Sequence, residues 1–310
     1  MKILIPNTIE LSLGSDADVV VYDVDAPVPA PHRDAAVLVA WHNSAEQLAD
    51  AARTLPALKL VQALASGADV VLNAGFASAV HICSGRSLHD GPVAEHALAL
   101  ILSAVRRLDR LHEAQHAHRW DQEFIAAQAA PETRDLYTLA GATVTIWGFG
   151  SIAARLAPLL QLLGAEVHGI ARSSGERAGV PVVAESDASE LLGRTDVLVS
   201  LLPANAETAE LFDSAVFTAV KAGAVFVNVG RGATVDESAL IDALASGRLR
   251  AAAIDVTRSE PLPADSPLWD APNLVITPHV AGNRPVGSGA LIDENVRRLL
   301  AGEDLLNRVR

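Results

Sequence analysis

The chain has little cysteine, few aromatic residues and no excess of basic charge. Its 310 residues contain one cysteine, Cys83, which excludes an intrachain disulfide and a multi-cysteine metal site, so no metal is expected. The net charge of −13 would on average repel a nucleic-acid backbone or an anionic membrane. No apolar run approaches the roughly 20 residues of a membrane span, and the run over residues 1–6 is too short for a secretory signal. We therefore expect a cytoplasmic protein that binds neither nucleic acid nor membrane.

Short β-rich runs alternate with alanine- and leucine-rich helical stretches along the whole chain. This alternation predicts α/β domains with parallel sheets built from βαβ units, and the length suits about two domains. Helices are predicted over 93–111, 113–128 and 285–300. A first set of strands is predicted over 2–5, 19–22, 37–40 and 58–62, and a second over 143–147, 166–170, 197–201, 224–229, 251–255 and 274–276. Six strands are the number in a complete dinucleotide-binding domain.

A glycine-rich turn follows the predicted strand over 143–147. It reads Gly148-x-Gly150-x-x-Ala153 and opens a predicted helix at Ser151. Gly148 permits a tight turn, Gly150 lets the backbone approach a pyrophosphate, and the helix N-terminus offers N–H donors to it. The pattern predicts a dinucleotide site; the alternative is a plain strand–turn–helix.

The end of the next strand predicts which dinucleotide is preferred. Here the chain reads Ala171-Arg172-Ser173-Ser174, without the carboxylate that usually accepts from the ribose 2′-OH of NAD. Arg172 and Ser173 could instead hold a 2′-phosphate, so NADP is the expected cofactor ahead of NAD. The alternative is that Arg172 only stacks on adenine and both cofactors bind.

Three later segments place a charged or titratable side chain just after an apolar strand. These are Arg231 after 224–229, Asp255 with Glu260 after 251–254, and His279 after 274–276. An arginine, a carboxylate and a histidine at strand ends suit the polarising and protonating of a carbonyl group. With the dinucleotide turn, they predict a nicotinamide-dependent reductase. A surface salt bridge for Arg231 and a buried structural role for His279 are the alternatives.

These motifs resemble those of the D-2-hydroxyacid dehydrogenases, including the glyoxylate and hydroxypyruvate reductases. The resemblance covers most of residues 58–282 and little of the first 57, and its pieces are Ala94–Ala97, Gly148–Ile152, Leu202-Pro203, Asn228–Gly232, Asp255 with Glu260–Leu262, and Thr277–Gly282. It implies a Rossmann cofactor domain over 96–285, inserted into a flavodoxin-like substrate domain of residues 1–95 and 286–310. The active site would lie between the two domains. It also implies a homodimer, with the contact sought over Leu108 to Asp135.

The resemblance further implies roles for single residues. Arg231 would hold the ketone oxygen and a carboxylate oxygen of a small 2-oxo acid, and His279 would protonate the alkoxide to give a D-2-hydroxy acid. Glu260 would favour the protonated form of His279. The loop Ser66-Gly67-Ala68, where Ala68 replaces the usual glycine, would bind the substrate carboxylate through backbone N–H groups. The cofactor contacts would be Gly148, Gly150, Ser151, Ile152, Arg172, Ser173, Leu202, Pro203, Gly230, His279 and Asp255, the last accepting from the nicotinamide carboxamide or only capping its strand.

The stretch from Cys83 to Asp90 departs from the family, which usually has a Thr-Asn-x-Pro-like turn there. One hypothesis is that Arg86 or His89 recognises a distal polar group of the substrate; the alternative is a solvated loop. Two other functions also remain open. They are a dehydrogenase of a non-ketone substrate such as formate or phosphite, and a nicotinamide-sensing binding protein like the corepressors that share this fold.

Overall fold

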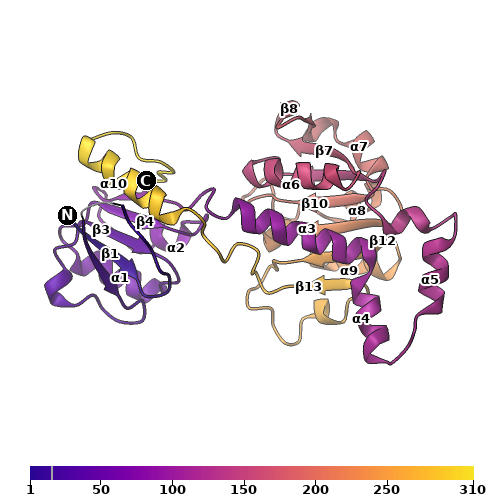
Figure 1. Ribbon diagram of the computed structural model, residues 1–310, viewed down its shortest axis with the longest axis horizontal. Coiled ribbons are helices and arrows are strands. Elements are labelled where there is room, and N and C mark those ends of the chain that lie inside the picture. The colour runs from indigo at the N-terminus through magenta and orange to yellow at the C-terminus, as the bar shows by residue number, and fades with distance from the viewer. Residues whose placement is uncertain (15–16) are drawn as a thin grey trace. The chain divides into compact units, whose positions relative to one another are not determined.

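The computed structural model describes residues 1–14 and 17–310, which form two compact units (Figure 1). Unit 1 comprises Met1–His89 and Asn283–Arg310, and unit 2 comprises Asp90–Gly282. The boundaries predicted after residues 95 and 285 lie a few residues too late. The first differs because helix α3 begins at Asp90 and belongs wholly to unit 2.

Unit 1 is built on a five-stranded parallel sheet in the order β2-β1-β3-β4-β5. This is the flavodoxin-like order, as the resemblance implied. The strands are β1 (Lys2–Pro6), β2 (Asp18–Tyr22), β3 (Val37–Ala40), β4 (Leu60–Ala63) and β5 (His81–Cys83). The sequence prediction missed β5 because it is only three residues long.

Helices cover both faces of the unit 1 sheet. On one face lie α1 (Ala45–Thr54) and α2 (Asp69–Leu72), and on the other lies α10 (Ser288–Ala301). Helix α1 begins after Ser44, which caps it by accepting a hydrogen bond from the Gln47 amide. A short 3₁₀ turn, η1 (Ala30–His32), precedes β3.

Unit 2 contains an eight-stranded sheet in the order β13-β12-β11-β10-β6-β7-β9-β8. Read from β9 to β12, this is the Rossmann order 3-2-1-4-5-6. The sheet is parallel as predicted except at one edge, where β8 runs antiparallel to β9 in a hairpin that the sequence analysis missed. The strands are β6 (Thr143–Trp147), β7 (Glu166–Ala171), β8 (Gly175–Arg177), β9 (Val180–Ala184), β10 (Val197–Ser200), β11 (Ala224–Asn228), β12 (Leu249–Ile254) and β13 (Leu274–Ile276).

The unit 2 sheet is also covered on both faces. Helices α3 (Asp90–Arg106) and α6 (Ser151–Leu162) lie on one face, and α7 (Ser189–Arg194), α8 (Ser214–Ala219) and α9 (Glu237–Ala245) on the other (Figure 1). Helices α4 (Leu108–His116) and α5 (Gln122–Ala129) follow α3. The helix predicted over 93–111 is broken at Arg107, whose φ of 55° is left-handed. The 3₁₀ turns are η2 (Arg134–Tyr137), η3 (Glu185–Asp187), η4 (Gly232–Thr234) and η5 (Pro267–Asp270).

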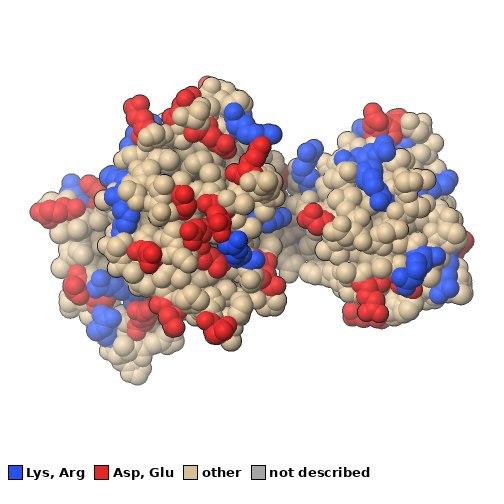
Figure 2. Space-filling view, turned by 180° about the vertical axis from the view of Figure 1, so that it is seen from behind, with Lys and Arg blue, Asp and Glu red and all other residues tan. Residues whose placement is uncertain are grey.

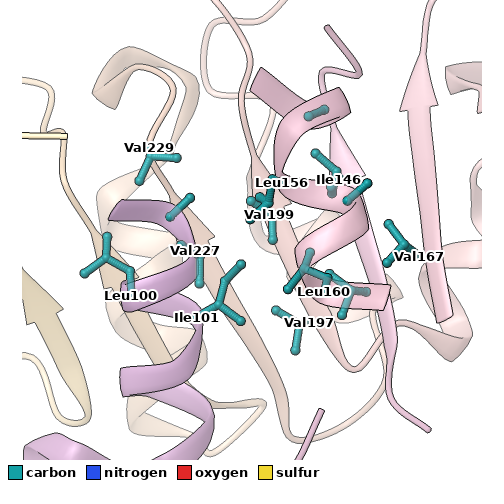
Figure 3. Packing of buried hydrophobic residues seen from close by; sticks show 14 of the residues in the cluster. Leu100, Ile101, Ile146, Leu156, Leu160, Val167, Val197, Val199, Val227 and Val229 are labelled. Atoms are coloured by element: carbon teal, nitrogen blue, oxygen red, sulfur yellow. The ribbon is translucent and has the colours of Figure 1, made fainter. Parts of the chain in front are cut away.

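Aliphatic side chains from α3 and α6 fix these helices to the sheet. Figure 3 shows Ile101 of α3 near Val227 of β11, and Leu156 and Leu160 of α6 near the valines of β10. Burying each such side chain is worth about 1.5–3 kcal/mol. The packing holds the strands in register, so the loops at their carboxyl ends start from fixed positions.

The surface carries charges of both signs. Figure 2 shows acidic and basic side chains interspersed over the visible face of each unit. Across residues 1–14 and 17–310, every helix is too short or too polar to cross a membrane.

Candidate active site

The glycine turn after β6 leaves the N-terminus of α6 open to a ligand. Gly148 has a φ of 99°, and a Cβ there would meet the Leu201 backbone at 2.8 Å, so only glycine fits. Gly150 is the N-cap of α6 and offers no side-chain cap, and a Cβ on it would stand in open space. The first N–H groups of a helix have no partner within it. A pyrophosphate would therefore find free donors at Ser151 and Ile152, and the turn fits a dinucleotide.

The loop after β7 lies beside this turn, because Gly148 N donates to Ile170 O. Arg172 and Ser173 are both exposed here. The structure adds Arg177, which the sequence analysis missed. Its guanidinium donates to the carbonyl (3.1 Å) and hydroxyl (2.9 Å) of Ser173, and more weakly to Phe149 O (3.4 Å). The two arginines Arg172 and Arg177 therefore lie near the predicted 2′-phosphate position. Arg177 reaches this position because the β8–β9 hairpin folds back on the loop.

Arg231 stands on a turn held by the strand before it. The buried Asn228 accepts from Gly230 N (3.0 Å) and donates to Arg231 O (3.1 Å). Arg231 is exposed, and its Nη1 donates to Gly230 O at 2.7 Å. Asn228 thus holds the turn that carries Arg231, a role that the sequence analysis, which placed Asn228 only within the family motif, did not identify.

Asp255 anchors the turn that carries His279. It is 1% exposed, and its carboxylate accepts from Thr277 Oγ1 (2.6 Å), Val280 N (3.0 Å) and Ala281 N (3.0 Å). His96, from α3, lies 3.3 Å away and was not identified from the sequence. This arrangement is the strand-end cap that was the alternative reading of Asp255. Its contact with a nicotinamide carboxamide stays a prediction.

His279 and Glu260 form a close pair. His279 Nδ1 lies 2.6 Å from Glu260 Oε2, while Thr257 N donates to Glu260 Oε1 at 3.1 Å. With Nδ1 donating to the carboxylate, Nε2 remains to exchange a proton with a ligand. The His279 side chain is 46% exposed and therefore accessible to one.

The strands of the unit 2 sheet bring the glycine turn and the loops of the candidate site to one edge of the sheet. Strand β12 pairs in parallel with β11 and β13, so Asn228, Ile254 and Ile276 lie side by side. The loops carrying Arg231, Asp255 and His279 all leave from this carboxyl edge, as does the glycine turn after β6. Leu202, which is buried, and Pro203, which is exposed, follow β10 at the same edge. In parallel α/β sheets this is the edge where ligands bind.

In unit 1 the predicted carboxylate loop, Ser66-Gly67-Ala68, follows β4. Ser66 and Gly67 are exposed and Ala68 is buried. The segment 83–90 packs against the residues just before this loop. Gly85 N donates to Ala65 O (2.7 Å), and a Cβ on Gly85 would lie 1.9 Å from Leu64 O.

His89 is a buried residue that contacts the backbone just before that loop. It is 6% exposed, its Nε2 lies 2.8 Å from Leu64 O, and its ring stacks on Trp41. The hypothesis that His89 recognises a substrate group is therefore wrong for a side chain so buried. Arg86 is exposed, and its carbonyl accepts from Asn307 Nδ2, so its recognition of substrate stays a prediction.

Across the described ranges, 1–14 and 17–310, no group of three or more His, Cys, Asp or Glu side chains could hold a metal ion. The candidate site comprises a dinucleotide turn and a set of an arginine, a carboxylate and a histidine.

Comparison with known proteins assigns this combination to a family. Residues 98–281 match the model of the D-isomer specific 2-hydroxyacid dehydrogenase, NAD binding domain. Glyoxylate/hydroxypyruvate reductase A of Escherichia fergusonii is 31% identical over 287 residues, which are 90% of this chain and 87% of that protein. The chain therefore belongs to the D-isomer specific 2-hydroxyacid dehydrogenase family, as the resemblance indicated.

Other relatives differ in length. D-3-phosphoglycerate dehydrogenase of Mycobacterium leprae is 33% identical over 256 residues, 80% of this chain but only 46% of that protein, so the chain spans about half of such relatives. Among solved structures, a family member from Aeromonas salmonicida superposes with a TM-score of 0.80 at 28% identity, covering 100% of this chain and 98% of that one. The NADPH-dependent glyoxylate/hydroxypyruvate reductase of Sinorhizobium meliloti, in complex with NADP and sulfate, does so with 0.80 at 26%, covering 99% and 97%.

Proposed function

We propose that the protein reduces a small 2-oxo acid, such as glyoxylate or hydroxypyruvate, to a D-2-hydroxy acid with NADPH. The observation that carries the proposal is the His279–Glu260 pair, 2.6 Å apart, at the sheet edge that also bears Arg231 and the dinucleotide turn. A proton donor, a guanidinium and a nucleotide site are the parts that carbonyl reduction needs.

The nicotinamide, when bound, supplies a hydride to the carbonyl carbon. The protein's own residues bind the substrate and supply the proton. Arg231 would hold the ketone oxygen and one carboxylate oxygen with its planar fork and oppose the negative charge that develops. His279 Nε2 would give its proton to that oxygen, while Glu260 keeps the ring oriented through Nδ1. Ser66 and Gly67 remain the predicted ligands of the substrate carboxylate.

NADP is proposed ahead of NAD. The loop after β7 has no carboxylate and carries Arg172, with Arg177 bonded to Ser173 beside it. The S. meliloti reductase was solved with NADP, and a relative from Xanthobacter autotrophicus with NADPH. Both observations support a 2′-phosphate on this loop.

A non-phosphorylated substrate is favoured over 3-phosphoglycerate. The chain holds only three lysines, Lys2, Lys59 and Lys221, none within the predicted substrate residues. The relatives that match along most of their length are glyoxylate/hydroxypyruvate reductases, whereas the phosphoglycerate enzymes match over less than half.

The test is to follow nicotinamide absorbance with a panel of 2-oxo acids, each offered NADPH and NADH in parallel. Turnover of a small 2-oxo acid, faster with NADPH, is the expected result, and formate and phosphite with NADP serve as the non-ketone comparison. If the cofactor binds measurably but no compound turns over, the corepressor-like reading takes the place of this one.

A cytoplasmic homodimer is also proposed. Exposed apolar side chains gather on α4, α5 and the segment between them; Trp120 is 80% exposed, Ile125 47% and Leu108 40%. Such surface suits contact with a second copy of the chain. Sedimentation at micromolar concentration should give twice the 32.4 kDa of one chain, and a monomer there would refute the dimer.

A further inference from the structure

Helix α3 reaches the candidate active site through one histidine. His96 lies in the second turn of the helix, and its neighbours Val93 and Ala97 are buried in the core cluster between α3 and the unit 2 sheet. His96 Nε2 is 3.1 Å from Thr277 Oγ1 and 3.3 Å from Asp255 Oδ1. All three of these residues belong to unit 2. The reaction proposed above assigns no task to the His96 side chain.

The positions of the protons in this contact follow from the donors and acceptors present. A threonine hydroxyl has one proton, and the Thr277 hydroxyl donates it to Asp255 Oδ1 at 2.6 Å. Thr277 Oγ1 can therefore only accept a hydrogen bond from His96, and the ionised carboxylate of Asp255 can only accept as well. His96 Nε2 must accordingly carry a hydrogen and donate it toward these two oxygens.

The turn that carries His279 needs support from its surroundings. His279 has a φ of 52°, in the left-handed region that a residue with a side chain seldom adopts. Such a conformation persists only where the surrounding structure imposes it. The strand before the turn, β13, is three residues long and lies at the edge of the sheet, where it pairs with β12. The sheet therefore holds this turn from one side only.

Asp255 supplies part of that support. Its backbone carbonyl accepts from His279 N at 2.7 Å, and its carboxylate accepts from Val280 N and Ala281 N, each at 3.0 Å. The oxygen that holds Val280 N is Oδ1, the same oxygen that faces His96. A donor on the well-packed helix α3 therefore acts on the carboxylate that sets the backbone of the turn.

We propose that His96 is a positioning residue for the reduction. Its Nε2–H holds the Thr277 hydroxyl and Asp255 Oδ1 in place, and these two groups maintain the left-handed turn from which His279 presents its own Nε2 to the substrate. The role needs no contact between His96 and the substrate. The inference rests on the proposed function, in which His279 is the proton donor.

Amide exchange of the full chain tests the contact without relying on turnover. His96→Leu removes the donor and leaves a side chain of similar size, whereas His96→Gln keeps a donor at a similar distance from the backbone. The loss of one hydrogen bond should accelerate exchange at residues 279–281 by about 2- to 10-fold in His96→Leu. We expect wild-type exchange in His96→Gln and in Arg106→Leu, a control at an exposed position of α3, and unchanged exchange over β12 in all three variants.

Turnover then separates positioning from a general stabilising role. With a 2-oxo acid that the wild type reduces, His96→Leu should lower kcat by about 2- to 10-fold, and His96→Gln should restore it. The Kd for NADPH should not change. In the background of His279→Gln, measured with excess enzyme, His96→Leu should have no further effect on the rate, because His96 acts through His279.

Four results would overturn the proposal. They are unchanged exchange at residues 279–281 in His96→Leu, equal acceleration in His96→Gln, accelerated exchange with a wild-type kcat, and a loss of rate that persists in full in the His279→Gln background. If His96→Leu does not fold, the nitrogen-15 shifts of the wild-type His96 ring decide. A hydrogen on Nε2 is expected, and a neutral ring with its hydrogen on Nδ1 would refute the contact.

Failure of the proposed function would look different. A wild type that reduces no 2-oxo acid contradicts the reaction, whereas the exchange and nitrogen-15 measurements still show whether His96 holds the turn of His279.

Discussion

Replacing His89 by alanine probes how unit 1 holds its predicted carboxylate loop. The change leaves the buried carbonyl of Leu64 without its donor, which costs about 1–3 kcal/mol. It also removes the stack on Trp41, with ring centroids 5.5 Å apart and planes at 23°, worth about 0.5–1.5 kcal/mol. We expect the free energy of unfolding to fall by about 2–4 kcal/mol, and amide exchange over residues 64–68 to accelerate.

The kinetic consequence should be selective. Leu64 and Ala65 directly precede Ser66, so loosening them raises KM for the 2-oxo acid. The dinucleotide turn belongs to unit 2, so the Kd for NADPH should not change. His89→Gln is the matched control, because its amide can donate from a similar position to Leu64 O and should restore KM. The reasoning is refuted if His89→Gln is as damaging as His89→Ala, or if KM is unchanged although exchange over 64–68 has accelerated.

Three further outcomes are expected. His279→Gln should lower kcat by about 100- to 10,000-fold while NADPH binding, followed by nicotinamide fluorescence, is retained; wild-type turnover would remove His279 from the mechanism. Arg172→Ala should raise KM for NADPH by about 10- to 100-fold and leave KM for NADH unchanged, because one charge-assisted hydrogen bond is worth about 1.5–3 kcal/mol. An equal rise in KM for both cofactors would contradict the binding of a 2′-phosphate by Arg172. Burial raises the pKa of Cys83 to about 11, so its thiol stays protonated at neutral pH; iodoacetamide should label it only after denaturation, and rapid labelling of the native protein would contradict this.

The motifs of the candidate site could be predicted from the sequence because each is local. A glycine turn after a strand, or a histidine after a strand, is written in consecutive residues, and parallel pairing then brings the strand ends to one edge. Arg177 could not be found this way. It reaches Ser173 only because the β8–β9 hairpin folds back, and this short hairpin gives little periodic signal.

His89 shows a second limit of prediction from the sequence. In a departing loop, His89 looked like a substrate contact, yet its ring is buried against Trp41 and bonded to a backbone carbonyl. Burial and hydrogen-bond satisfaction depend on the elements that pack around a residue, and the spacing of residue types does not report them.

The His279–Glu260 pair is positioned by a series of contacts that links neighbouring strand ends. Gly232, after β11, lies so close to the following loop that a Cβ on it would be 2.0 Å from the Thr257 backbone. Thr257 N in turn donates to Glu260, and Glu260 pairs with His279. His279 N then donates to Asp255 O at 2.7 Å, which ties the His279 turn back to the residue that follows β12. Each of the three motifs therefore constrains the next. For this reason a glycine and a buried aspartate, neither of which needs to touch substrate, stand beside the arginine and the histidine that do the proposed chemistry.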